Sequence, residues 1–328
     1  MKTLSLITLV LALLFITGCS QKQYFEPEET DGDFSQSPKS MPAKIIGFNR
    51  SGATLDNGQI ITKDKMSTYK LPEGFEFINN SQKGVIATDN KSKIIIGNKS
   101  QPIEIGGVVV AATLKDSTLA MIYSDNSFAL YDLTSRKYLL KEYLSESLAN
   151  DTRITNPIFM KNLVLFPTLN GKIKVAGIKE KKIVKTITVD AEGTFNNIIY
   201  LNVINDTLIA ATSNKIISVG TQNLSTAEYE IRDVITNKNN IYIATIDGQL
   251  IKLDLNLTPL AKKKYKFARF YALAFGTSLY ALESQGFIIN VDEDFKEDKI
   301  LEFSFDEEEK AIGIENRLYF GDEYLEVK

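Results

Sequence analysis

The chain has 328 residues, with 38 Lys and Arg against 41 Asp and Glu, and its formal net charge is −3 at pH 7. This balance argues against a nucleic-acid-binding protein, because such proteins neutralise phosphates with an excess of Lys and Arg. The chain contains no His, no Trp and one Cys. These counts exclude a His-dependent catalytic triad, a His or paired-Cys metal site and an intrachain disulfide. Carboxylate chemistry and calcium binding stay open, because 41 acidic residues are available. The composition still favours a binding protein over an enzyme, and we expect no catalytic residue, no metal site and no cofactor.

Residues 1–18 have the features of an export signal. Lys2 precedes a mostly apolar run from Leu4 to Ile16, which is shorter than the roughly 20 residues that span a bilayer. The run ends in Ile16-Thr17-Gly18-Cys19, which resembles the lipobox of bacterial lipoproteins. That resemblance implies cleavage before Cys19 and acylation of Cys19. The alternative is a buried core Cys that follows an uncleaved membrane helix.

The lipoprotein resemblance also implies a location. In enteric bacteria an Asp after the acylated Cys retains lipoproteins at the inner membrane, and Ser20 occupies that position here. We therefore expect a lipid-anchored protein at the outer membrane of a Gram-negative bacterium, facing the periplasm. Inner-membrane retention is the alternative, because this sorting rule differs between bacterial groups.

Residues 19–43 are expected to hold the lipidated Cys and a flexible tether. After Cys19 the segment has three Pro, five carboxylates and almost no aliphatic side chains, a composition typical of solvated linkers. One stretch, Gln23-Tyr24-Phe25, is compatible with a β-strand, and this is the alternative.

From Lys44 to Lys328 the chain repeats a unit of about 38 residues. Each unit has a short apolar run, a tight turn rich in Asn, Asp and Gly, and a second run. The turns end at Gly58, Asn90, Asn126, Gly171, Asn214, Gly248, Gly286 and Asp322. Because each unit has room for four strands of about five residues, residues 44–328 predict an all-β fold, a β-propeller of eight four-stranded blades. Seven blades is the alternative, if the first turn belongs to the closing blade.

The unit from Ala244 to Asp254 reads Ala-Thr-Ile-Asp-Gly-Gln-Leu-Ile-Lys-Leu-Asp. It resembles the PQQ-like β-propeller repeat, although the Trp of that family's docking motif is absent. Some members of the family are quinone-dependent dehydrogenases, in which a Trp stacks on the quinone beside calcium and an Asp acts as base. Here Asp151, Asp190 and Asp247 are not accompanied by a motif for quinone or calcium binding. The resemblance therefore favours the propeller fold without the dehydrogenase activity.

The last unit has only three strands before Lys328. An unpaired edge is an aggregation hazard, so we expect the segment 20–43 to supply the fourth strand. The β-compatible stretch Gln23-Tyr24-Phe25 would then lie beside Tyr324 to Val327.

Two intervals between turns exceed the mean and place insertions near residues 141–156 and 188–197. Loops on a rigid scaffold commonly carry function, so we predict a partner-binding site there, with residues 141–149 as support. Its polar members would be Asp151, Arg153, Asp190 and Glu192. Plain surface insertions are the alternative.

Separately, Asn256 in Asp254-Leu255-Asn256-Leu257-Thr258 fits the acceptor pattern of bacterial N-glycosylation.

A lipobox, a tether and PQQ-like repeats together resemble the propeller lipoproteins of the outer-membrane β-barrel assembly machinery. That resemblance implies a non-catalytic scaffold that binds the periplasmic domains of the β-barrel insertase, with no nucleic-acid partner and no small-molecule substrate. Two alternatives stay open. One is a scaffold for another envelope complex, and the other is a PQQ-type quinoprotein enzyme.

Overall fold

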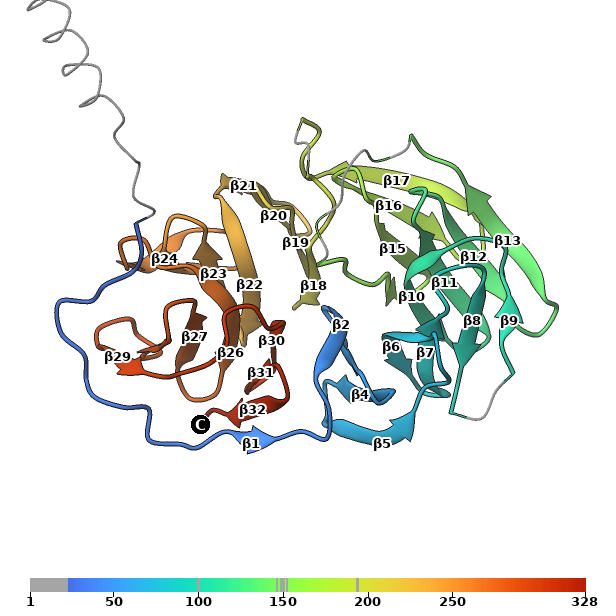
Figure 1. Cartoon of the computed structure of the whole chain (residues 1–328). Coiled ribbons are helices and arrows are strands. Elements are labelled where there is room, and N and C mark those ends of the chain that lie inside the picture. Colours follow the sequence, from blue (N-terminus) through green and yellow to red (C-terminus); the bar gives the residue numbers. More distant parts are fainter. Residues whose placement is uncertain (1–22, 99–100, 146, 148–150, 152, 193–194) are drawn as a thin grey trace, which may run out of the picture.

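The computed structural model describes residues 23–98, 101–145, 147, 151, 153–192 and 195–328. The elements that it describes are 32 β-strands, arranged in eight four-stranded sheets. The sheets follow one another around a ring (Figure 1). Within the described residues, no helix has the length and apolar character needed to cross a membrane.

Seven blades are meanders of four consecutive antiparallel strands, with the first strand innermost and the fourth outermost. The eighth blade combines the last three strands with β1. Blades 1 to 4 contain β2 (Ile45–Asn49), β3 (Gly52–Leu55), β4 (Gln59–Thr62), β5 (Met66–Lys70), β6 (Glu76–Ser81), β7 (Gly84–Thr88), β8 (Lys93–Ile96), β9 (Ile103–Glu104), β10 (Val109–Lys115), β11 (Thr118–Tyr123), β12 (Phe128–Asp132), β13 (Lys137–Glu142), β14 (Ile158–Met160), β15 (Leu163–Pro167), β16 (Lys172–Gly177) and β17 (Lys182–Thr188). Blades 5 to 8 contain β18 (Tyr200–Ile204), β19 (Thr207–Ala211), β20 (Lys215–Val219), β21 (Leu224–Glu228), β22 (Ile231–Asn237), β23 (Asn240–Thr245), β24 (Gln249–Asp254), β25 (Pro259–Lys264), β26 (Phe270–Phe275), β27 (Leu279–Glu283), β28 (Phe287–Val291), β29 (Asp298–Glu302), β30 (Ala311–Ile314), β31 (Arg317–Phe320), β32 (Glu323–Glu326) and β1 (Lys39–Ser40).

The predicted propeller of eight four-stranded blades is confirmed, and the seven-blade alternative is wrong. All eight predicted turns lie between the second and third strands of a blade. Gly58, Gly171 and Gly248 have φ angles of 81°, 72° and 83° there, in the left-handed region that these turns require.

A second sequence signature, an apolar run closed by Asp, marks the turn between the third and fourth strands. Asp132 accepts hydrogen bonds from the backbone N–H groups of Thr134 and Ser135, both at 3.2 Å. Asp254 accepts in the same way from Asn256 at 2.8 Å. The carboxylate satisfies the backbone of the turn, which is why Asp recurs at this place.

The core lies between blades. Second and third strands are buried along most of their length, as in β23, because a neighbouring blade covers each face. Ile86 of blade 2 and Leu119 of blade 3, for example, belong to one apolar cluster. Burial on both faces replaces the polar–apolar alternation of a solvated sheet with continuous apolar runs.

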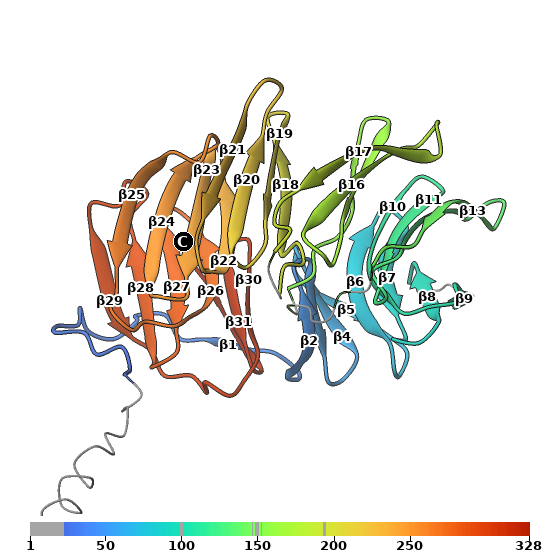
Figure 2. The ribbon, with the colours of Figure 1, turned by 90° about the horizontal axis from the view of Figure 1, so that it is seen from above.

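The ring has two different faces, and its strands run between them (Figure 2). We call one the connection face, because it carries the inter-blade connections and the turns between second and third strands. The opposite face carries the other two sets of turns, which join first to second and third to fourth strands.

Residues 23–43, which we call the N-terminal strap, do not form the flexible tether that their composition predicts. The strap runs along the outside of blades 6 to 8 (Figure 1). Phe25 is 5% exposed and Met41 is 6% exposed. The backbone N–H of Glu302 in β29 donates to the carbonyl of Gly32 at 2.9 Å, and that of Phe34 donates to the carbonyl of Glu302 at 2.9 Å. A few apolar side chains in a polar segment therefore attach it to the ring.

The strap supplies the closing strand, as predicted, but a different stretch of it does so. Lys39 pairs with Tyr324 and Ser40 with Glu323 in the eighth blade. The predicted stretch Gln23-Tyr24-Phe25 lies elsewhere, because the Phe25 ring is buried between blades 6 and 7. The Lys39 side chain adds an ion pair to this backbone pairing, with its Nζ 3.4 Å from Oε2 of Glu326. Because Lys39 and Glu326 are 287 residues apart, no local sequence signal marks this strand.

Candidate functional site

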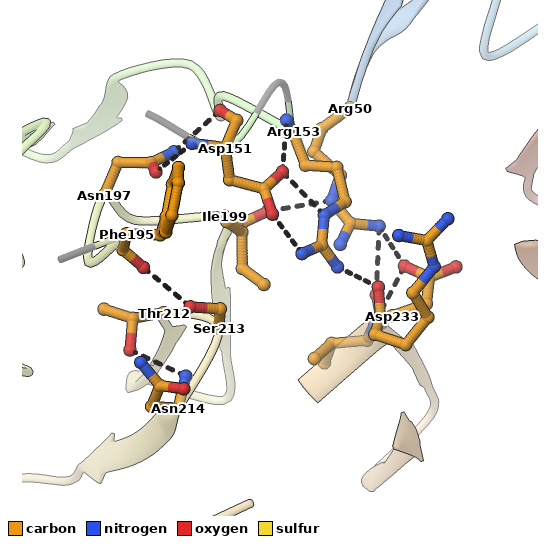
Figure 3. Close-up of polar contacts among 12 residues, drawn as sticks. Arg50, Asp151, Arg153, Phe195, Asn197, Ile199, Thr212, Ser213, Asn214 and Asp233 are labelled. Carbon is orange, nitrogen blue, oxygen red and sulfur yellow. Dashed lines mark hydrogen bonds and ion pairs between the residues drawn. The ribbon is translucent and has the colours of Figure 1, made fainter. Parts of the chain in front are cut away.

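The two longest inter-blade connections meet on the connection face. One covers residues 143–157 between β13 and β14, and the other covers residues 189–199 between β17 and β18. The backbone N–H of Asp151 donates to Oδ1 of Asn197 at 2.7 Å, and Nδ2 of Asn197 donates to the carbonyl of Asp151 at 3.1 Å (Figure 3). Because Asn197 is completely buried, this exchange joins the two predicted insertions into one structural unit.

Asp151 and Arg153 form an ion pair at this junction. Nε of Arg153 donates to Oδ1 of Asp151 at 2.8 Å, the Arg153 backbone N–H donates to the same oxygen at 2.9 Å, and Nη2 contacts Oδ2. Burial pushes the pKa of Asp151 upward, but the hydrogen bonds and charge of Arg153 outweigh it and hold that pKa below its usual value. Nη1 of Arg153 donates to the carbonyl of Arg232 in blade 6. Two predicted site residues thus fasten their connection to the ring.

Arg50 reaches across the centre of the ring from the turn between β2 and β3. Its Nε donates to the carbonyl of Ile199 at 2.8 Å, and its Nη1 pairs with Asp233 in β22 (Figure 3). Asp233 is 6% exposed, and it also accepts from the N–H groups of Val234 at 2.9 Å and Leu273 at 3.1 Å. This pair connects blade 1 with blades on the far side of the ring.

The sequence did not predict a role for Arg50, Arg232 or Asp233. Arg50 and Asp233 are 183 residues apart, and nothing in either repeat indicates that they meet. One local signal was present: Arg232 and Asp233 interrupt an apolar run at the start of the first strand of a blade. Two charged residues at an otherwise apolar position indicate a polar role.

A pocket of about 340 Å³ opens beside these ion pairs on the connection face. We call it the mouth pocket. It combines three aromatic rings with cationic and anionic side chains. Its lining residues are Phe48, Asp151, Arg153, Phe195, Arg232, Tyr271, Glu309, Lys310 and Ala311. Phe195 is 52% exposed, which is unusual for a Phe side chain.

Two of the lining side chains occupy β-bulges. The register of the first two strands shifts at Arg232 in blade 6 and at Tyr271 in blade 7. A bulge turns a side chain away from the ladder, and here it directs both side chains to the mouth pocket. The Arg232 guanidinium lies 5.8 Å from the centroid of the Tyr271 ring.

A larger cavity of about 830 Å³ occupies the centre of the ring. The innermost strands line it with amide and hydroxyl groups. Asn156 is 9% exposed, and it connects Ser51, Ile78 and Ala112 through hydrogen bonds of 2.9, 3.2 and 2.8 Å. Since Asn156 belongs to the 143–157 connection, that connection supports the ring itself, and shortening it would disturb the centre.

The remaining predicted site residues lie apart from the mouth pocket. Asp190 accepts from the backbone N–H of Glu192 at 3.1 Å and from Oγ1 of Thr212 at 3.4 Å, and the Glu192 side chain is exposed. Asn256 is exposed in the turn between β24 and β25 on the opposite face, and its glycosylation stays a prediction. Cys19 lies outside the described residues. Within those residues, no three Asp, Glu or Cys side chains form a group suited to a metal ion.

No protein-family model matches this chain. It is similar to the plasminogen-binding protein PgbB of Helicobacter pylori. In strain J99 the two chains are 28% identical over 380 aligned residues, which cover 97% of this chain and 70% of PgbB. PgbB of strain 26695 is also 28% identical, with the same coverage.

Solved structures share the fold at lower sequence identity. BamB from Moraxella catarrhalis superimposes with a TM-score of 0.64 at 14% identity, over 87% of this chain and 95% of BamB. Sqt1 from Saccharomyces cerevisiae gives a TM-score of 0.61 at 11% identity, over 90% and 99%. The propeller fold expected from the PQQ-like repeats is thus confirmed, and the similarity to PgbB extends over almost the whole chain.

Proposed function

We propose that this protein is a non-catalytic propeller scaffold that binds a partner protein at the mouth pocket. The observation that carries the proposal is the junction of the two longest connections, which places the exposed Phe195 beside Arg153 and Arg232. Binding energy at protein interfaces concentrates in a few aromatic and Arg side chains that line pockets. The mouth pocket has that composition.

The chemistry of the carboxylates at the mouth supports a binding role. Asp151 is held by Arg153 and has a lowered pKa, so it is a poor general base near neutral pH. Asp233 accepts three hydrogen bonds, from Arg50, Val234 and Leu273. Both carboxylates therefore have structural partners, and we assign neither a catalytic role.

The proposal includes a lipid anchor on Cys19 at the outer membrane, with the ring in the periplasm. The lipobox supports this anchor. The path of the strap determines which face of the ring the anchor would hold near the membrane. Phe25 packs against Tyr265, in a connection of the connection face, and against Phe287, which directly follows a turn of that face. Six residues span at most about 20 Å, so an acylated Cys19 would hold the mouth close to the membrane.

The first candidate partner is the periplasmic part of the outer-membrane β-barrel insertase, which would make this protein an accessory component of β-barrel assembly. The lipobox and the fold shared with BamB support this candidate. A different envelope complex is the alternative within the same class.

The second candidate partner is plasminogen. It is favoured by the PgbB similarity, which covers 97% of this chain. Because the identity is 28%, we carry over the binding role as a hypothesis and assign no residue to it.

Affinity purification of the full lipidated protein from its own cell envelope tests the proposal. We expect the insertase to co-purify with the parent and with Leu224→Ala, and to be reduced with Phe195→Ala. Leu224 is 67% exposed on the opposite face, so it is a matched control. Purified plasminogen on a sensor surface tests the second candidate with the same three proteins. If neither partner distinguishes Phe195→Ala from the control, the mouth pocket does not bind them.

The anchor has its own test. Cys19→Ser should leave an unprocessed precursor without acyl label, because acylation requires the thiol. If that variant still carries acyl label and sediments with outer membranes, Cys19 is not the attachment site.

A further inference from the structure

Within the part of the chain that the structure describes, two cations of the mouth pocket form no ion pair, and they indicate the charge of the group that the partner supplies. Asp151 is paired with Arg153, and Glu309 is paired with Lys44. After these pairs are formed, Arg232 and Lys310 are the remaining charged side chains of the lining. Both are exposed. Among the described lining residues, the charge that is left without an ion pair is therefore positive.

The contacts of Arg232 fix the base of its side chain and leave its terminal nitrogens open to an anion. The Arg232 Nε donates to the carbonyl of Phe270 at 2.9 Å, and Nη1 of Arg153 donates to the carbonyl of Arg232. Its two terminal nitrogens have no hydrogen-bond partner among the described residues. The side chain is fixed at its base by these contacts and by the Tyr271 ring, while its bidentate end is open. A carboxylate matches such an end with two parallel hydrogen bonds.

The electrostatics of Arg232 favour an added negative charge. Although the residue as a whole is exposed, neighbouring protein atoms partly desolvate the Arg232 guanidinium. This desolvation and the nearby charge of Arg153 lower the pKa of Arg232, while Asp233 and Asp151 act in the opposite direction. A guanidinium that lies beside another cation is under-compensated, and an anion placed at its open end would relieve that repulsion.

The rest of the pocket sets the size and polarity of the occupant. Phe48, Phe195, Tyr271 and Ala311 supply apolar surface next to Arg232. A volume of about 340 Å³ accepts a few side chains of a chain segment and is too small for a folded module. The exposed acidic residues 306–308 precede Lys310 in the chain, so a long acidic tract would be repelled, whereas a single carboxylate beside an apolar side chain fits.

We propose that the mouth pocket binds a segment of the partner protein in which an Asp or Glu lies next to an aromatic residue. The carboxylate of the partner accepts hydrogen bonds from both terminal nitrogens of Arg232, and Lys310 adds a second positive charge. The aromatic ring next to that carboxylate packs on Phe195. This inference rests on the proposed function, since it names the chemistry that the same site recognises.

Arginine side-chain NMR on the full mature chain tests the proposal. The probes are two blocked peptides, Gly-Phe-Asp-Phe-Gly and Gly-Phe-Asn-Phe-Gly, which differ by one charge and are added to millimolar concentration. We expect the Asp peptide to shift the Arg232 signals in a saturable manner. The Asn peptide should bind about tenfold more weakly or worse, because a charge-assisted hydrogen bond is replaced by a neutral one.

Variants separate the charge from the fold. Arg232→Gln should weaken the Asp peptide about tenfold, and Arg232→Lys should recover part of the loss because it restores the charge without the bidentate geometry. Arg136→Gln is the matched control, since Arg136 is exposed in the turn between β12 and β13 on the opposite face. It should bind as the parent does, and all three variants should melt within a few degrees of the parent.

Equal affinity for the two peptides, no saturable shift with the Asp peptide, or an unchanged affinity of Arg232→Gln would overturn the proposal. Those results would leave the proposed function intact if Phe195→Ala still weakens partner co-purification, because the site would then bind by other chemistry. If Phe195→Ala and Leu224→Ala co-purify partners equally, the proposed function itself fails, whatever the peptides do.

Discussion

Replacement of one aromatic side chain should release the N-terminal strap from the ring. Phe25 is 5% exposed, and its ring contacts Tyr265 and Phe287 edge-on, with centroids 6.2 and 5.5 Å away. A buried Phe→Ala change costs about 3–5 kcal/mol. We expect the low end for Phe25→Ala, about 3 kcal/mol, because the slot lies at the rim and water can enter it.

That loss can be followed by melting and by hydrogen exchange. In a chain of this size about 1 kcal/mol shifts the melting temperature by about 2 °C, so Phe25→Ala should melt about 6 °C lower. The amides of Ile300 and Glu302 report on the strap directly, because they donate to Asp31 at 2.7 Å and to Gly32 at 2.9 Å. Both should exchange faster in Phe25→Ala.

The control is Tyr143→Ala, an aromatic side chain that is 69% exposed, and it should change neither readout. A parental melting temperature together with parental exchange at Ile300 and Glu302 would refute the idea that Phe25 holds the strap. A lower melting temperature with unchanged exchange at both amides would show that Phe25 stabilises the ring without holding the strap.

Three further perturbations test separate parts of the structure. Asp233→Asn leaves the Arg50 guanidinium without its buried counter-charge and should lower the free energy of unfolding by about 3 kcal/mol. In a double-mutant cycle with Arg50→Met the two losses should not add, and simple additivity would contradict an energetic coupling of the two residues. Gly171→Ala should destabilise the fold strongly, because its Cβ would lie 1.8 Å from a backbone carbonyl, whereas Gly74→Ala, with φ 80° and no atom within 4 Å, should cost only about 1 kcal/mol; equal melting temperatures would contradict this reasoning. Hydrogen bonds from the side chains of Ser135 and Ser117 and from the backbone N–H groups of Thr134 and Ser135 lower the pKa of Asp132 to about 2. Its stabilising contribution is therefore complete above the ordinary carboxyl pKa and is lost as the pH falls toward 2, so the stability advantage of the parent over Asp132→Asn should vanish across that range, and an advantage that persists at pH 2 would be inconsistent with it.

The fold was largely predictable because its signals are local and repeated. Gly58, Gly171 and Gly248 mark turns that need positive φ, and Asp132 and Asp254 mark turns that need a backbone acceptor. Each repeat carries the same short-range requirement, so the spacing of the turns gives the number and size of the blades without knowledge of their packing.

Other features depend on contacts between distant residues, and the sequence could not give them. The pairing of Lys39–Ser40 with β32 joins distant parts of the chain, and the ion pair of Lys39 with Glu326 joins residues 287 positions apart. The burial of Phe25 likewise depends on a slot formed by blades 6 and 7. At the candidate site, insertion length correctly indicated where the two connections lie, and Asp151 and Arg153 do line the mouth pocket. The charged pair Arg232-Asp233 indicates a polar role for this part of β22, but the direction of the Arg232 side chain depends on the bulge, which the sequence does not predict.

The central claim, that the mouth pocket binds a partner protein, is tested most directly by site-specific photocrosslinking in living cells. A photoreactive phenylalanine analogue is placed at position 195 in the mouth or at position 224 on the opposite face, two sites at which the native side chains are 52% and 67% exposed. If the mouth pocket binds a partner protein, position 195 should give a discrete protein adduct that is absent from position 224. Adducts of equal yield from both positions, or an adduct from position 224 alone, would contradict it.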